Sequence, residues 1–310
     1  MNIYTNIADI DCQDGSVVTI GTFDGLHAGH RALIDTLIYK SAELNFKNIL
    51  VTFDPHPRNV VNENSKIQTL STLDEKLKIL EHLGVENVLV IKFTKEFSEV
   101  NYENFLREYI IKGLNVKLLI IGHDHKFGKD REGNETKLKQ FSAQNGFEVI
   151  SVTSVEIDGE IVSSTKIRNN LLFGKIIEAN KFLMQNYFIE GIVVKGSQRG
   201  RELGFPTANI KTDDDKLLPV EGVYAVSCKI ENIVYFGMMN IGKRPTFDKF
   251  EKPIIEINLF EFNLDIYDKK VWIEIYDFIR DEVRFNSKED LIEQLRLDKA
   301  TIENYLNLIH

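Results

Sequence analysis

The spacing of apolar residues changes once along this chain of 310 residues, and this change constrains the fold more than any other feature. In the first half, short apolar runs alternate with segments of helical spacing. The runs cover residues 17–20, 48–53, 87–91, 116–121 and 147–152, and the helical segments cover residues 31–44, 72–83, 102–111 and 135–144. This alternation predicts an α/β fold with a doubly wound, Rossmann-like parallel sheet.

The second half has a different period. Between residues 187 and 278, apolar and polar residues alternate and β-branched residues are frequent, which is typical of antiparallel strands. The expected strands cover residues 189–194, 222–230, 233–238, 254–260 and 271–278. We predict an antiparallel β-barrel or sandwich, with the barrel preferred, followed by a C-terminal helix over residues 288–309. The chain is therefore divided into domains of residues 1–185 and 186–310.

Composition narrows the classes of partner. The formal net charge is −9, whereas a general nucleic-acid-binding protein usually has a basic face. Cys12 and Cys228 lie far apart, so we expect neither a disulfide framework nor a cysteine zinc site. No secretory leader and no membrane-spanning run is recognisable. We expect a cytoplasmic protein that acts on small molecules, without nucleic-acid or membrane partners, and the sequence leaves its oligomeric state open.

A segment rich in glycine and histidine follows the first apolar run. Residues 21–30 read GTFDGLHAGH, so His27 and His30 face one side of the first turn of a helix. Free backbone N–H groups at a helix start favour phosphate, and Gly29 lets phosphate approach closely. Two imidazoles there can stabilise the charge that develops when pyrophosphate leaves an α-phosphorus. The glycines at either end of GTFDG permit the tight turn before the histidines.

Two other interpretations of these histidines stay open. One or both of them could merely cap the helix, and this is the preferred interpretation for an isolated pair with this spacing. A transition-metal site is the second alternative, because His123 and His125 add two further imidazoles. It is disfavoured because no glutamate stands between His27 and His30, and no cysteine lies nearby.

The second half contains its own phosphate-type segment. Residues 199–209 read RGRELGFPTAN, in which Gly200 and Gly204 permit the backbone to approach a phosphate. The proline fixes its own φ and is expected to hold Thr207 and Asn209 in an extended loop. A hydroxyl and an amide oxygen suit Mg²⁺. The segment is not a Walker P-loop, and a simple glycine turn would explain only fragments of it.

The first segment resembles the signature of the nucleotidyltransferase superfamily. Over nearly its whole length, the chain is similar to the prokaryotic bifunctional riboflavin kinase/FMN adenylyltransferases. The other segments that carry this resemblance are residues 52–57 (TFDPHP), 122–128 (GHDHKFG), 131–133 (REG), 163–168 (SSTKIR), 199–209, 240–247 (NIGKRPTF) and 280–285 (RDEVRF).

The resemblance implies site residues in the first domain. It places His27 and His30 on the ATP phosphates as catalytic groups. It implies that ATP is also bound by Gly21, Phe23, Gly29, Ser164, Thr165 and Arg168. The hydroxyls can cap free N–H groups and an arginine can bind phosphate bidentately, although such a run of hydroxyls is more often only a cap. The implied flavin pocket consists of Phe53, Pro55, His56, Pro57 and Asp124.

In the second domain, the resemblance makes Glu256 the base that takes the proton of the riboflavin 5′-hydroxyl. Strand alternation places Glu256 and Asn258 on the face opposite Ile255 and Ile257, where an isolated glutamate would usually be solvated. The resemblance assigns ATP binding to Gly200, Arg201 and Gly204, Mg²⁺ to Thr207 and Asn209, and flavin binding to Arg280 and Phe285.

Four departures from the family pattern stand out. His125 replaces a usual phenylalanine, Asn134 a common aspartate and Gln198 a frequent glycine, and residues 184–186 replace a Gly-Arg-Pro run. The first two concern flavin or metal contacts in the first domain. The last concerns contacts between the domains more than chemistry.

The resemblance implies an enzyme that activates flavin in two steps. Riboflavin is phosphorylated by ATP with Mg²⁺ to FMN, and AMP from a second ATP is then transferred to FMN, which gives FAD and pyrophosphate. Three rivals stay open. They are a riboflavin kinase with an impaired or altered first domain, a non-catalytic flavin or nucleotide sensor, and a different acceptor of AMP in the first site.

Overall fold

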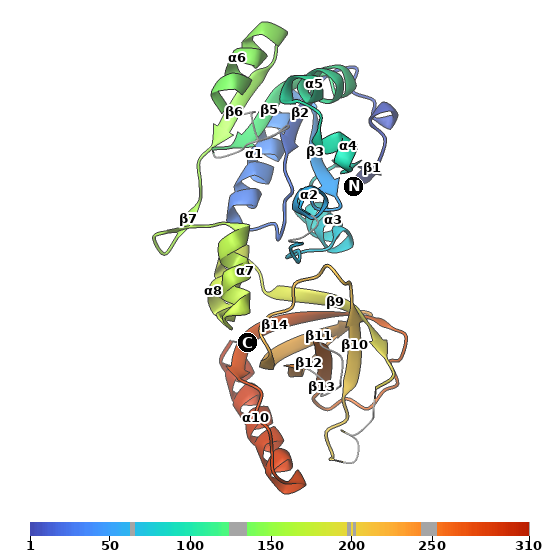
Figure 1. Cartoon of the computed structure of the whole chain (residues 1–310), viewed down its shortest axis with the longest axis vertical. Helices are drawn as coiled ribbons and strands as arrows, with labels where there is room; N and C mark the ends of the chain where they lie inside the picture. The colour runs from blue at the N-terminus through green and yellow to red at the C-terminus, as the bar shows by residue number, and fades with distance from the viewer. Residues whose placement is uncertain (63–65, 124–134, 197–199, 201–202, 243–252, 310) are drawn as a thin grey trace. The chain divides into compact units, whose positions relative to one another are not determined.

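A computed structural model describes residues 1–62, 66–123, 135–196, 200, 203–242 and 253–309 (Figure 1). The chain forms two compact units, Met1–Ser164 and Thr165–His310. The helices that follow Val162 therefore belong to the second unit, although the expected sequence domains divide later, at residue 185.

The first unit is built on a six-stranded sheet with the order β1-β4-β3-β2-β5-β6. All of its strand pairs are parallel. The strands are β1 (Asn2–Tyr4), β2 (Ser16–Ile20), β3 (Lys47–Asp54), β4 (Asn87–Lys92), β5 (Val116–Gly122) and β6 (Glu148–Val152). The five strands expected from the apolar runs are confirmed, and β1 is an additional short edge strand. Its three residues are too few to give a periodic signal.

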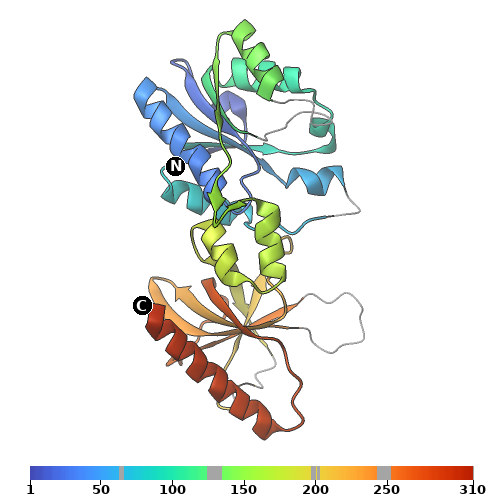
Figure 2. The same ribbon diagram turned by 90° about the vertical axis from the view of Figure 1, so that its left-hand side faces the viewer.

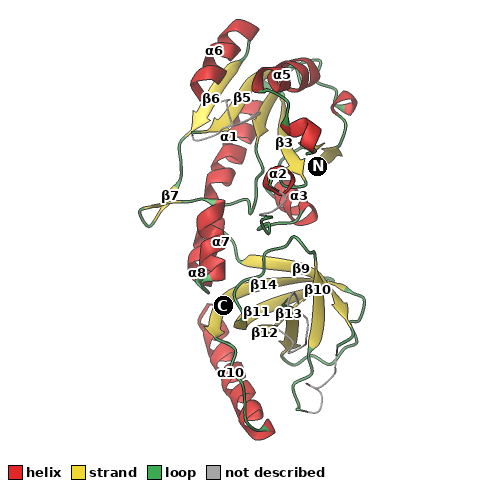
Figure 3. Ribbon diagram, in the orientation of Figure 1, coloured by secondary structure: helices red, strands yellow, loops and turns green. Residues whose placement is uncertain are grey.

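Helices cover this sheet (Figure 3). They are α1 (Ala28–Leu44), α2 (Pro57–Val61), α3 (Leu73–His82), α4 (Lys95–Ser98), α5 (Tyr102–Phe105) and α6 (Glu135–Asn145), with a 3₁₀ turn η1 (Ile7–Asp9). A separate two-stranded hairpin is formed by β7 (Glu156–Ile157) and β8 (Glu160–Ile161). The helix expected over residues 102–111 is correct in place. It is one α-turn that continues as a π-helix, η2 (Leu106–Gly113).

The strand order decides where this unit can bind a ligand. The chain runs from β2 through β3 to β4 on one side, and β5 then pairs with β2 on the other side. The order therefore reverses between β2 and β5. In open α/β sheets, ligands bind outside the carboxyl ends of the strands at such a switch point. The loop after β2 contains His27.

The second unit begins at Thr165 within α7 (Ser164–Leu172), includes α8 (Ile176–Leu183) and continues into a closed barrel. The barrel order is β10-β13-β12-β11-β14-β9, and each pair is antiparallel. The strands are β9 (Tyr187–Val194), β10 (Ala208–Thr212), β11 (Gly222–Ile230), β12 (Ile233–Gly242), β13 (Ile254–Leu259) and β14 (Lys270–Arg280). The barrel and its five expected strands are confirmed, whereas β10 was not expected.

The C-terminal helix α10 (Lys288–Ile309) is confirmed and lies along the outside of the barrel (Figure 2). Its Ile302 and Leu306 pack against Val223, Ala225 and Met238 of β11 and β12. The barrel interior is filled by the alternate positions of the strands. None of the helices in the described part of the chain is long and apolar enough to span a membrane.

Candidate functional site

The two histidines of the first segment lie at the start of α1. Their rings are stacked, with centroids 3.7 Å apart and planes inclined by 18°. His27 occupies the N-cap position, but its side chain makes no capping hydrogen bond to the described helix. The expected common face of the two rings is therefore confirmed, and the simple capping interpretation is not supported at His27.

His30 packs against an aromatic side chain of the preceding loop. The Phe23 ring meets it edge-on, with centroids 5.3 Å apart. Its Nδ1 is buried and makes no hydrogen bond to any described residue, and such buried polar atoms call for a functional explanation. Burial lowers the pKa of His30 well below 6.5, and positive charge on His27 and Lys76 lowers it further. His30 is therefore a neutral imidazole at pH 7.

The loop before the histidines is strained. Phe23, Gly25 and Leu26 have φ values of 49°, 82° and 46°, in the left-handed region. Complete burial of the two apolar side chains holds this conformation, which is typical of functional loops. The tight turn expected of the glycines uses Gly25. Gly21 instead leaves room for the Phe23 ring, because a Cβ there would lie 3.2 Å from that ring.

Asp24 connects this loop to two other segments. Its Oδ1 accepts hydrogen bonds from the backbone N–H groups of Leu70 and Ser71, at 2.8 and 3.2 Å. Its backbone carbonyl accepts one from Ser164 Oγ at 3.0 Å. The predicted phosphate residue Ser164 therefore contacts the histidine segment. Thr165 and Arg168 lie in the second unit, on the first turns of α7, so their ATP contacts stay predictions.

Lys76 was not singled out from the sequence, but it contacts the segment that leads to the histidines. It lies on α3 with 6% of its surface exposed, and its Nζ donates to Thr22 O at 2.7 Å and to Thr52 Oγ1 at 3.4 Å. A signal was available in the helical spacing. Lys76 stands between Leu73 and Leu80 on the apolar face of α3, where a lysine is unusual.

The predicted flavin pocket lies where β3 ends. Phe53 packs edge-on against Phe93, with centroids 5.6 Å apart. After it, His56 Nδ1 accepts a hydrogen bond from Arg58 N and caps α2, and Pro57 follows as the first helical residue. Phe53, Pro55, His56 and Pro57 therefore share one edge of the sheet. Asp124 and the two departures His125 and Asn134 lie outside the described residues.

Of the two further histidines in the transition-metal alternative, His123 lies within the described residues and His125 does not. His123 is exposed, and its Nδ1 lies 3.5 Å from Glu135 Oε2. No group of three or more His, Cys, Asp or Glu side chains in the described ranges could hold a metal ion.

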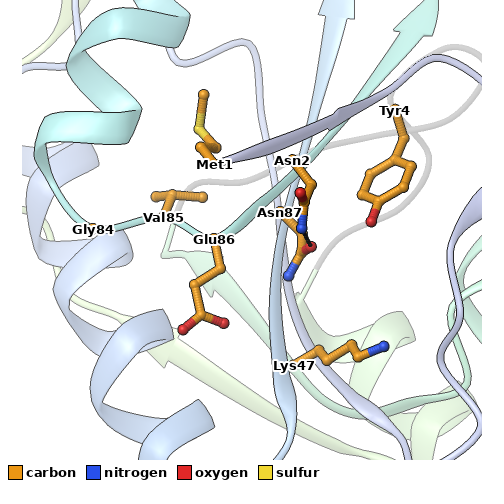
Figure 4. A pocket seen from close by; sticks show the side chains of 8 residues that line it. All are labelled: Met1, Asn2, Tyr4, Lys47, Gly84, Val85, Glu86 and Asn87. Carbon is orange, nitrogen blue, oxygen red and sulfur yellow. Dashed lines mark hydrogen bonds between the residues drawn. The ribbon is translucent and has the colours of Figure 1, made fainter.

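A depression of about 540 Å³ lies elsewhere in this unit, lined by Met1, Lys47, Glu86 and Asn87 among others (Figure 4). Lys47 and Asn87 begin β3 and β4, so this depression lies at the amino ends of the strands. The histidines follow the carboxyl end of β2. The depression is therefore not part of the candidate site.

In the barrel, three polar side chains form a row across neighbouring strands. Glu256 of β13 lies directly opposite Asn209 of β10 on one side and opposite Asn240 of β12 on the other. Directly opposite residues share a face, with Cβ atoms about 4.5–5.5 Å apart. Ile255 and Ile257 are 1% exposed and fill the interior, so the row faces outward. The expected orientation of Glu256 is confirmed.

Two glycines fit closely around the Thr207–Asn209 segment. A Cβ on Gly196 would lie 2.0 Å from Asn209 Nδ2, and one on Gly200 would lie 2.3 Å from Phe205 O and 3.2 Å from Thr207 Oγ1. The expectation of an extended loop is correct for Thr207 but wrong for Asn209, which pairs within β10 on both sides. Pro206 does not exclude this strand, because proline is tolerated where a strand begins.

The remaining residues of this segment divide between described and undescribed positions. Gly204 is at φ 79° in a turn, where glycine avoids strain. Arg201 and the departure at Gln198 lie outside the described residues, as does most of the 240–247 segment.

Arg280, a predicted flavin residue, is joined to the C-terminal helix. Its Nε lies 2.9 and 3.1 Å from the two carboxylate oxygens of Asp298, and its Nη2 lies 2.7 Å from Oδ2. Gln294 Nε2 also donates to Asp298 Oδ1 at 2.8 Å. The Phe285 ring lies near, with its centroid 5.9 Å from Arg280 Cζ. These contacts bring the two predicted flavin residues together.

Known proteins resemble both units. A family model described as FAD synthetase matches residues 9–166, and one described as riboflavin kinase matches residues 183–306. The bifunctional riboflavin kinase/FMN adenylyltransferase of Buchnera aphidicola is 38% identical over 302 residues, 96% of each chain. The protein of that name from Bacillus subtilis is 38% identical over 299 residues, 95% of this chain and 94% of its own. A crystal structure from Streptococcus pneumoniae, described as a macrolide-efflux protein, matches with a TM-score of 0.88 and 33% identity, over 97% of this chain and 98% of the other.

Proposed function

The chain belongs to the bifunctional riboflavin kinase/FMN adenylyltransferase family, and we propose which of its residues perform each of the two reactions. It is an enzyme that phosphorylates riboflavin with ATP to FMN and then transfers an adenylyl group from ATP to FMN, which gives FAD and pyrophosphate. The observation that carries the assignment is that each compact unit has its own polar constellation. The stacked histidines lie in the first unit, and the Asn209–Glu256–Asn240 row lies in the second.

In the kinase unit, Glu256 takes the proton of the 5′-hydroxyl of riboflavin while that oxygen attacks the γ-phosphorus of ATP and ADP leaves. A positioned general base typically contributes about 10²–10⁴-fold to the rate. Asn209 and Asn240 lie directly opposite Glu256 on the neighbouring strands, and Asn240 Nδ2 donates to Glu282 Oε1 at 3.1 Å. Arg280 and Phe285 bind the flavin, and Gly200, Arg201 and Gly204 bind the phosphates of ATP.

Mg²⁺ fits the residues of the kinase unit. Thr207 and Asn209 offer a hydroxyl and an amide oxygen, which are hard ligands of the kind that Mg²⁺ prefers beside substrate phosphates. Gly200 leaves the space beside Thr207 Oγ1 free of a side chain. When bound, the ion would neutralise charge on the phosphates. Thr207 and Asn209 would hold it there.

In the first unit, a phosphate oxygen of FMN attacks the α-phosphorus of ATP and pyrophosphate leaves. His27 and His30 donate hydrogen bonds to the charge that develops, together with the free N–H groups at the start of α1. Since His30 is neutral, it contributes as a dipole and not as a cation. Ser164, Thr165 and Arg168 hold the triphosphate, and the Phe53–Pro57 edge with Asp124 holds the flavin and adenine rings.

The wild-type protein tests this scheme first. The full chain is incubated with riboflavin, excess ATP and Mg²⁺, and riboflavin, FMN and FAD are separated chromatographically over time. We expect FMN to form first and then to become FAD. FMN that accumulates without FAD, even from FMN as the starting substrate, contradicts the assignment of His27 and His30. Tight flavin and ATP binding with no turnover contradicts both sites.

His30→Ala then tests the division between the units. FAD formation from FMN should fall by about 10²–10³-fold, which is typical for loss of one stabilising donor, while FMN formation stays unchanged. His82→Ala, on the exposed end of α3, is the matched control. Equal loss of both activities in a folded variant contradicts the two-site assignment.

A cytoplasmic location and the lack of nucleic-acid partners stay predictions from the sequence.

A further inference from the structure

We propose that Lys76 is a positioning residue for adenylyl transfer, because its ammonium group ties the histidine loop after β2 to the end of strand β3. The inference rests on the proposed function of the first unit. It concerns a residue outside both histidine and flavin segments. Neither the sequence motifs nor the assigned reaction uses Lys76.

The Lys76 ammonium group makes two hydrogen bonds, one to each of the two segments. Lys76 Nζ donates to the carbonyl of Thr22 at 2.7 Å and to the hydroxyl of Thr52 at 3.4 Å. The Thr52 hydroxyl donates in turn to the same Thr22 carbonyl at 3.3 Å. Thr22 lies between the end of β2 and the strained turn, and Thr52 is one residue before Phe53. One ammonium group therefore joins the segment that orients the histidines to the segment that forms the flavin edge.

The start of the same helix is joined to the same loop by further hydrogen bonds. Thr72 and Glu75 form a capping box at the start of α3, which fixes the helix end that carries Lys76. Just before the cap, the N–H groups of Leu70 and Ser71 bond Asp24 of the histidine loop. Hydrogen bonds thus hold the start of α3 and the histidine loop together, and Lys76 connects them to β3.

Burying the Lys76 side chain costs free energy, because its charge is removed from water. Burial lowers the pKa of Lys76, while Asp24 and Asp54 raise it. A methionine or leucine would fill a core position of a helix without desolvating a charge. Three other charged or titratable groups face the ammonium, namely Asp24, Asp54 and His30. The Lys76 ammonium group therefore lies among the groups of the proposed reaction site. Its removal should change the electrostatic environment of His30.

The test compares Lys76→Met, Lys76→Arg and Lys78→Met in the full chain. Methionine keeps the length and apolar stem of lysine but cannot donate. Lys78 lies on the exposed side of the same helix and is the matched control. We expect kcat for adenylyl transfer to fall about 10–100-fold in Lys76→Met, which is the effect of a misplacement of about 1 Å, with little change in Lys78→Met. Lys76→Arg should recover a large part of the loss.

Riboflavin phosphorylation by the same preparation is the internal control, since it takes place in the other unit. A second readout separates positioning from mere stability. In Lys76→Met, NMR titration should show a higher pKa for His30, because a nearby positive charge has been removed. Adenylyl transfer within twofold of wild type overturns the proposal, and so does a loss that Lys78→Met shares or that kinase activity follows. A wild-type protein that makes no FAD would instead refute the proposed function.

Discussion

Glu256 lies directly opposite Asn209 in the antiparallel pairing of β13 with β10, and both side chains face the outside of the barrel. The interior positions on either side of Glu256 are isoleucines with almost no exposed surface. A carboxylate in this place contributes nothing to the core. It lies beside β10 and the segment before it, which carry glycine, hydroxyl and amide groups suited to ATP and Mg²⁺.

Glu256→Gln should therefore remove the base without disturbing the barrel. We expect riboflavin phosphorylation to fall by about 10²–10⁴-fold, while FAD formation from supplied FMN is unchanged. Initial rates with riboflavin and with FMN as alternative substrates measure the two effects. Glu261→Gln, at an exposed turn after β13, is the control and should keep both activities. Phosphorylation within tenfold of wild type would exclude Glu256 as the base.

Gly196→Ala tests whether the position of Asn209 matters. The new Cβ would lie 2.0 Å from Asn209 Nδ2, so the amide must move. We expect at least a tenfold loss of riboflavin phosphorylation and a higher Mg²⁺ concentration for half-maximal rate. A Mg²⁺ titration of the initial rate measures both. An unchanged Mg²⁺ dependence would show that Asn209 does not hold the ion.

The sequence predicted the sheet and the barrel because their strands alternate or form apolar runs, and it predicted the outward direction of Glu256 for the same reason. It did not predict β10, because Pro206 and the neighbouring glycines indicate a loop and the strand has only five residues. Lys76 was missed because a lysine is normally assigned to the solvated face of a helix. The partner of Arg280 could not be identified from spacing, since Asp298 lies 18 residues away and meets it only through packing of α10.

Asp298→Asn tests the attachment of α10. Asp298 is 2% exposed and binds the guanidinium group of Arg280, which is 20% exposed. Removal of one partner of a buried ion pair leaves the other charge uncompensated, so the barrel should lose about 3 kcal/mol of its free energy of unfolding. Trp272 is the single tryptophan of the chain and lies in β14, so its fluorescence in a urea titration follows the barrel. Glu293→Gln, on the exposed face of α10, should change stability by less than about 0.5 kcal/mol. An equal effect of both substitutions would contradict the role of the pair.

The pKa of His30 makes the stability of the first unit depend on pH. Burial holds this pKa well below 6.5 in the folded protein, whereas the unfolded chain titrates near 6.5. As the pH falls below 6.5, the unfolded state therefore takes up a proton that the folded state does not. Stability is full above pH 6.5 and falls below it, by at most about 1.4 kcal/mol per pH unit for one proton.

His30→Asn removes this proton uptake, so its free energy of unfolding should fall less than that of wild type between pH 7.5 and pH 5.5. Urea titrations by circular dichroism, corrected for the barrel transition seen by Trp272 fluorescence, measure the difference. His82→Asn is the control, because it makes the same substitution at an exposed histidine of the same unit. The sign of the difference between wild type and His30→Asn, as the pH falls, distinguishes a buried neutral imidazole from an ion-paired one. A histidine stabilised as a cation would make the wild type gain stability, relative to His30→Asn, as the pH falls.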